Sequence, residues 1–83
     1  MSKIQVDFSQ YVVSLARGVM TGLGEIPDPE TQTKQQNLDL ARHGICVLQM
    51  LFAKTEGNLS PDEKKLLLTI IDDLTNKLAV AEE

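Results

Sequence analysis

The chain has 83 residues, the size of one small domain, and a formal net charge of −4. Its eight Lys and Arg residues are scattered and form no basic stripe for phosphates, so nucleic acid is not expected as a partner. The only cysteine, Cys46, excludes an internal disulfide. The amino terminus lacks a secretion-signal pattern, and no apolar run approaches the ~20 residues of a bilayer span. The sequence therefore predicts a cytoplasmic protein with no membrane partner.

The first predicted helix covers residues 8–23. Asp7 can cap its beginning, with Gln10 three residues later, and Gly24 is suited to end it. Residues 1–6 alternate only weakly between apolar and polar, and we expect a frayed end rather than an extended arm. At 100° per residue the apolar side chains cover an arc of about 200°, which is too wide for an ordinary surface helix.

A row of small residues, Ser14, Gly18 and Gly22, follows one side of this helix at intervals of four. Glycine inside a helix costs up to ~1 kcal/mol relative to alanine, so the row needs a structural reason. Close approach of another backbone is one such reason. For Gly22 the alternative is that it belongs, with Gly24, to a fraying helix end.

Residues 24–37 form a polar linker between helices. Its two prolines favour extended and turn conformations, so no helix passes through it. A connection of this length is longer than most in compact helical domains, and such loops are often functional. The alternative is a plain spacer that reverses the chain. As a functional loop it predicts a contact for another protein at Pro27, Asp28, Pro29, Glu30 and Thr31.

The second predicted helix covers residues 38–56, with Asn37 as its N-cap and Gly57 as its stop. Its apolar residues recur at helical spacing in two neighbouring rows, which predicts a helix with two buried sides. The first row is Leu38, Ala41, Ile45, Leu48 and Phe52, and the second is Leu40, Val47 and Leu51.

The third predicted helix covers residues 61–80. Ser60, Pro61 and Glu63 supply an N-cap, a proline at the first helical position and the second half of a capping box. Its apolar residues form one stripe with polar residues opposite, which is typical of an outer helix. The short gap at 57–59 predicts that the second and third helices are antiparallel neighbours.

These features predict an all-α fold, a three-helix bundle-like domain spanning residues 1–83. Three helices of one chain cannot cover all of the apolar surface, so we expect a homodimer in which the first helices cross. The interface is predicted on one of two flanks of the first helix. One flank carries Val13 and Met20, and the other carries Ser14, Gly18 and Gly22.

Few residues in the sequence indicate a catalytic or metal-binding site. Asp39 and His43 lie one turn apart and could supply two metal ligands, but an ordinary surface pair is the simpler interpretation. Cys46 has only Arg42 nearby as an activator, and we interpret it as a small apolar residue. There is no glycine-rich phosphate loop, nucleophile elbow or CxxC motif. The sequence therefore predicts no enzyme, no metal and no cofactor.

Several short segments carry a family resemblance: Phe8-Ser9 with Ser14-Leu15-Ala16, Ile26-Pro27-Asp28-Pro29-Glu30-Thr31, Asn37-Leu38 with Ala41-Arg42, and Met50-Leu51 with Lys54-Thr55 and Gly57-Asn58-Leu59-Ser60. Together they resemble a small family of uncharacterised bacterial proteins classed as a domain of unknown function. The likeness covers nearly the whole chain and is most specific in the I-P-D-P-E-T loop and the K-T-x-G-N-L-S/T turn. It implies a helical fold and a bacterial cytoplasmic setting, but no activity.

Two functions follow as hypotheses. The first is a self-associating protein-interaction module with no catalytic activity. The second is a small-ligand binder that uses an apolar crevice between helices. No polar or charged residue interrupts the apolar stripes to orient a ligand, which favours the first hypothesis.

Overall fold

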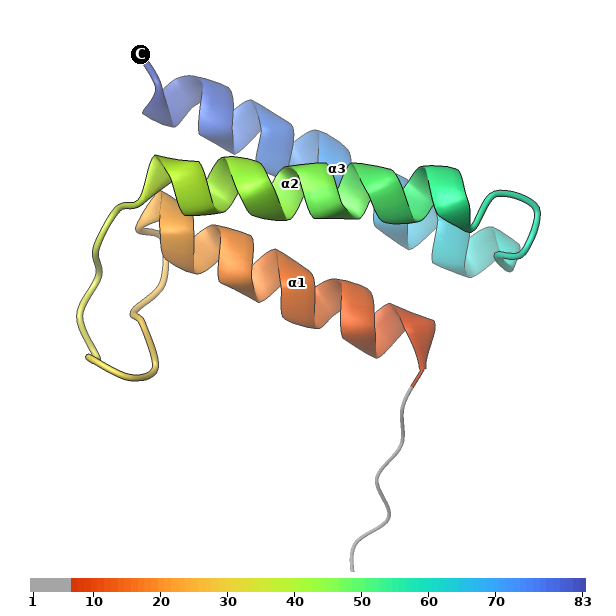
Figure 1. Cartoon of the computed structure of the whole chain (residues 1–83), viewed down its shortest axis with the longest axis horizontal. Helices are drawn as coiled ribbons and strands as arrows, with labels where there is room; N and C mark the ends of the chain where they lie inside the picture. The colour runs from red at the N-terminus through yellow and green to blue at the C-terminus, as the bar shows by residue number, and fades with distance from the viewer. Residues whose placement is uncertain (1–6) are drawn as a thin grey trace, which may run out of the picture.

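The computed structural model describes residues 7–83, in which three α-helices are connected by two loops. α1 spans Phe8–Leu23, α2 spans Leu38–Lys54 and α3 spans Pro61–Ala81. Figure 1 shows α1 and α2 side by side in opposite directions, with α3 crossing behind α2 and antiparallel to it; each pair of helices is in contact. The predicted all-α, bundle-like fold is confirmed, whereas the expectation for residues 1–6 lies outside the described residues.

The first two helices begin at the predicted caps. The Asp7 side chain accepts a hydrogen bond from the Gln10 N–H at 2.7 Å, and the Asn37 side chain accepts one from the Leu40 N–H at 3.1 Å. Each bond satisfies a backbone donor that has no partner inside its helix. α1 ends at Gly24, whose φ of 80° is the left-handed conformation that glycine adopts without strain.

The end of α2 differs from the prediction. The helix stops at Lys54, two residues before the expected boundary, and Thr55 is its C-cap. The Thr55 hydroxyl and N–H both donate to the Leu51 carbonyl, at 2.6 and 2.9 Å, and these bonds complete the last turn. Gly57 does adopt a left-handed φ of 86°, but it does so inside the turn rather than at the helix end.

α3 begins with the predicted capping box. The Glu63 N–H donates to the Ser60 hydroxyl at 3.2 Å, and the Glu63 carboxylate accepts from the Ser60 N–H at 2.8 Å.

Ser60→Ala removes the side-chain acceptor of this box. We expect a loss of about 1 kcal/mol in the free energy of unfolding, because the first turn of α3 loses its cap. Urea unfolding at fixed protein concentration measures the change, with Ser9→Ala as a control because Ser9 lies inside α1 and is no cap. An unchanged unfolding midpoint for Ser60→Ala would contradict the prediction.

Hydrophobic side chains from all three helices form one core. Leu48 and Leu67 are fully buried, and no polar or charged residue is buried between residues 7 and 83. Such a core is held by apolar burial and close packing alone. Its buried members are Val12, Val19, Leu23, Ala41, Ile45, Leu48, Leu67 and Leu74.

α2 buries only one of its two apolar rows. Ala41, Ile45 and Leu48 lie in the core, as expected. Leu40, in the second row, is 48% exposed, and the other members of that row, Val47 and Leu51, are only partly buried. The prediction of two buried sides is therefore wrong for a single chain, because α3 lies on the other side of α2 and the second row stays at least partly exposed within residues 7–83.

α3 has the single apolar stripe that was predicted. Leu67 and Leu74 are buried, and Ile70, Ile71 and Leu78 pack against the core.

In the part of the chain covered by residues 7–83, no helix is both long and apolar enough to cross a membrane.

Candidate interaction surface

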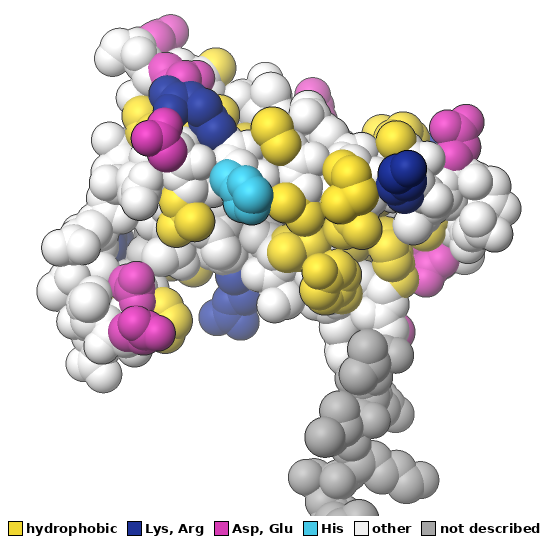
Figure 2. Space-filling model, in the orientation of Figure 1, with side chains coloured by type: hydrophobic (Ala, Val, Ile, Leu, Met, Phe, Trp, Pro, Cys, Tyr) yellow, Lys and Arg dark blue, Asp and Glu magenta, His cyan; other side chains and the backbone are white. Residues whose placement is uncertain are grey.

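The side of the α1 and α2 pair that faces away from α3 carries an exposed apolar surface, which we call the α1–α2 face. Tyr11 is 52% exposed, and Leu40 and Met50 are each 48% exposed. Figure 2 shows hydrophobic side chains gathered over α1 and α2, with the imidazole of the only histidine beside them. We define the face by Tyr11, Ser14, Leu15 and Gly18 of α1 and Leu40, His43, Val47 and Met50 of α2.

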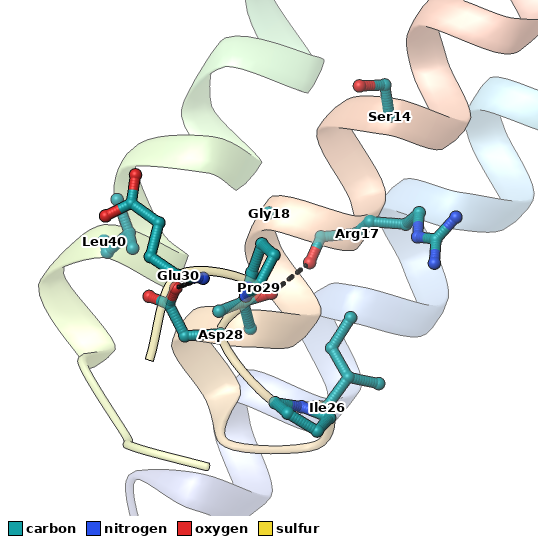
Figure 3. Close-up of a pocket in the computed structure, with 10 residues that line it drawn as sticks. Ser14, Arg17, Gly18, Ile26, Asp28, Pro29, Glu30 and Leu40 are labelled. Carbon is teal, nitrogen blue, oxygen red and sulfur yellow. Dashed lines mark hydrogen bonds between the residues drawn. The ribbon is translucent and has the colours of Figure 1, made fainter. Parts of the chain in front are cut away.

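Two connected hollows form a groove along this face. The smaller has a volume of about 260 Å³ and lies between α1 and α2. The larger has a volume of about 600 Å³ and lies between α1 and the head of the linker (Figure 3). Ser14, Gly18 and Leu40 line both hollows, so the groove continues from one to the other.

The small residues of α1 have different surroundings. A Cβ atom added to Gly18 would meet no atom of residues 7–83 within 4 Å apart from the adjoining backbone of α1, so Gly18 is an open part of the groove. A Cβ added to Gly22 would lie 3.0 Å from both the Ala41 nitrogen and the Asn37 oxygen. Gly22 is buried, and its carbonyl accepts a hydrogen bond from the Asn37 N–H at 2.7 Å.

Gly22 therefore does not belong to a surface between two chains. The close backbone approach that the row of small residues predicted does occur, but it occurs within the chain, where α1 meets the beginning of α2. The interpretation of Gly22 as part of a frayed end is also wrong, because α1 continues to Leu23. Ser14 and Gly18 are exposed and remain candidates for a contact outside the chain.

Gly44 is a packing residue that was not predicted from the sequence. A Cβ added there would overlap the Cγ2 atom of Val19, which is 1% exposed. Gly44 thus lets α1 and α2 approach closely at the floor of the smaller hollow. The signal was present in the sequence, since a glycine in the middle of a helix needs a structural reason in α2 as much as in α1.

The other predicted flank of α1 is a separate feature. Val13 is 44% exposed, whereas Met20 is partly buried and packs against the core. Val13 lies about 140° around the helix from Gly18, given 3.6 residues per turn. The predicted interface residues therefore do not form one surface, and the groove lies on the flank that carries Ser14 and Gly18.

The head of the linker is a compact turn at one end of the groove. The Asp28 N–H donates to the Thr33 carbonyl at 3.0 Å, and the Gln32 N–H donates to the Asp28 carbonyl at 2.7 Å. The Asp28 carboxylate also accepts from the Glu30 N–H at 2.7 Å. These bonds hold the turn together, and the turn lies beside α1 (Figure 3). Within it lie the predicted contact residues, of which Pro27, Pro29, Glu30 and Thr31 are exposed and Asp28 is half-buried.

Arg42 joins the beginning of α2 to the end of α3. Its guanidinium donates to the Asp39 carboxylate at 2.7 Å and to the Glu82 carboxylate at 2.9 and 2.6 Å. The hydrogen bonds that Arg42 donates to the Glu82 carboxylate raise the pKa of Arg42 above its ordinary value. Arg42, the cation expected near Cys46, is thus engaged by two carboxylates. Within residues 7–83, no cluster of three or more His, Cys, Asp and Glu side chains has a geometry suited to a metal ion.

Comparison with protein families matches residues 5–79 to the family described as "Domain of unknown function (DUF1844)". No curated protein matches the chain, and no solved structure matches it. The match covers most of the chain and confirms the resemblance to a domain of unknown function. The chain therefore belongs to the DUF1844 family.

Proposed function

We propose that the protein is a protein-interaction module without catalytic activity, and that the α1–α2 face is its binding surface. The observation that carries the proposal is the exposure of Tyr11, Leu40 and Met50 around a groove with Gly18 as an open part of it. Contiguous apolar surface is typical of protein contact sites. Removing apolar surface from water is favourable by about 25 cal/mol per Å², and this gain must exceed the entropy cost of association.

A protein surface suits the groove better than a small ligand does. Small-molecule sites enclose most of the ligand and orient it with a few well-placed polar groups. No polar or charged side chain is buried in residues 7–83, so the polar side chains that line the hollows are at least partly exposed and do not enclose a ligand. A small apolar ligand in the 260 Å³ hollow is the second candidate.

The head of the linker extends this proposed surface. Glu30 and the half-buried Asp28 line the larger hollow and add negative charge at one end of the groove. A partner with a basic group at that end complements these carboxylates, which favours specificity and association rate. We further propose a cytoplasmic setting in bacteria, which the family resemblance implies; a reducing compartment also suits the exposed thiol of Cys46.

Site-specific photo-crosslinking in the host cells tests the proposal. We expect a crosslinking side chain at position 40 to capture a protein, which mass spectrometry then identifies. The captured protein can be a further copy of this chain. The same group at Thr69, an exposed position of α3, is the matched control. Met50→Asp should abolish the adduct and change the free energy of unfolding by only about 0.5 kcal/mol, since Met50 is half exposed.

Equal adduct yields from positions 40 and 69 would show that the α1–α2 face is not a binding surface. An adduct from position 40 must also be reproduced with purified proteins. A co-purified small molecule in the absence of any protein adduct would support the second candidate instead.

A further inference from the structure

We infer that a second copy of the chain covers the α1–α2 face, turned so that each α2 lies antiparallel to the other α2 and each α1 to the other α1. This inference rests on the proposed interaction function and adds the identity and the orientation of the partner. It differs from a dimer of crossed α1 helices because α2 supplies half of the contact.

On α1, the exposed ring of Tyr11 and the open surface at Gly18 complement each other. They lie seven residues apart and therefore on the same side of the helix. In an antiparallel pair of α1 helices centred at Ser14 and Leu15, Tyr11 of each copy lies over Gly18 of the other. Apart from the adjoining backbone of α1, no atom of residues 7–83 lies within 4 Å of a Cβ at Gly18, which leaves room for the ring.

On α2, the charges at the two ends complement each other. Asp39 lies in the first turn, and its side chain is 95% exposed although it contacts Arg42. Lys54 lies in the last turn and makes no ion pair with any residue from 7 to 83. An antiparallel pair of α2 helices places Asp39 of each copy opposite Lys54 of the other. The same arrangement places the two helix dipoles antiparallel, which is electrostatically favourable.

Both pairings require an axis at the same level of the bundle. The midpoint between Tyr11 and Gly18 falls at Ser14 and Leu15, and the midpoint between Asp39 and Lys54 falls at Cys46 and Val47. Ser14, Leu15 and Val47 line the same hollow, so these midpoints lie side by side. A single two-fold axis generates both pairings. It lies between the two copies and runs across α1 and α2 at the level of these midpoints. This is the self-complementarity that a two-fold interface needs.

Cys46 provides a direct test of the orientation, because it is the only cysteine, is exposed and lies next to the inferred axis. We expect a short bis-maleimide to join two copies through Cys46, with a yield that follows the dimer fraction found by sedimentation equilibrium. In a Cys46→Ser background, Thr69→Cys places the thiol on the exposed side of α3 and should give little covalent dimer.

Two substitutions on opposite flanks of α1 test the contact itself. Gly18→Leu should weaken dimerisation by about tenfold or more, because the new side chain occupies the space of the Tyr11 ring. Val13→Lys should leave the dimerisation constant unchanged. Circular dichroism should show the same helix content for both, because neither position is buried in the chain.

Three outcomes would overturn the inference: a monomer at high micromolar concentration, a dimer that bis-maleimide does not join at Cys46, or a dimer broken by Val13→Lys and not by Gly18→Leu. The proposed interaction function has a separate readout. Position 40 would still capture a different protein in cells if only the inference of a second copy were wrong. It would capture no protein if the interaction function were wrong as well.

Discussion

Leu48→Ala is expected to lower the free energy of unfolding by about 2–5 kcal/mol, the range for deletion of a buried leucine side chain. Leu48 is 0% exposed and lies in the core, to which all three helices contribute. The substitution removes apolar burial and leaves a cavity that rigid neighbouring helices only partly fill. A domain of 83 residues has little stability in reserve, so Leu48→Ala should be largely unfolded at 37 °C.

Urea unfolding followed by circular dichroism measures this effect, with all variants at the same protein concentration. Leu68→Ala is the matched control, because Leu68 is 43% exposed on α3 and should cost less than about 1 kcal/mol. Equal losses for the two variants would mean that Leu48 is not part of a close-packed core.

Gly22→Ala is expected to destabilise the fold by about 2 kcal/mol, although alanine is the better helix former by ~1 kcal/mol. The added Cβ would lie 3.0 Å from two backbone atoms of the neighbouring segment, at Asn37 and Ala41. Backbone atoms cannot move aside as the end of a flexible side chain can, so α1 and α2 must separate. The hydrogen bond from the Asn37 N–H to the Gly22 carbonyl lengthens as they do.

Gly18→Ala is the control for helix propensity, and the opposite sign is expected. Its Cβ meets no atom within 4 Å, so the substitution should stabilise the chain by up to about 1 kcal/mol. Thermal unfolding at low micromolar concentration keeps any contribution of association small. Stabilisation by both substitutions would show that the contact of Gly22 with α2 does not limit the approach of the helices.

Local signals in the sequence determine most of the fold. Asp7, Asn37 and Ser60 are capping residues, and each lies directly before the helix predicted from it. These positions were predictable because an N-cap acts through hydrogen bonds within four residues. The end of α2 was not predictable in this way, because both Thr55 and Gly57 can end a helix. In the structure the helix ends at the earlier of the two, where the Thr55 hydroxyl bonds to the Leu51 carbonyl.

The surface was harder to predict, because it depends on contacts between helices. The row of Leu40 and Val47 has the helical spacing of a buried row, and only the position of α3 on the other side of α2 shows that it stays partly exposed. Likewise, Gly18 and Gly22 are equivalent in a helical projection of α1 alone. They differ because of where α2 begins: Gly22 lies against Asn37 and Ala41, whereas Gly18 contacts neither residue.

The hydrogen bond between Asn37 and Gly22 has a consequence for how the chain tolerates change. It joins the two ends of the linker at 2.7 Å, so the linker is a closed loop attached to a fixed base. Lengthening such a loop costs little, since each doubling of its length adds only ~0.6 kcal/mol of closure entropy. Insertions and new sequences within residues 25–35 can therefore accumulate without disturbing the pairing of the helices.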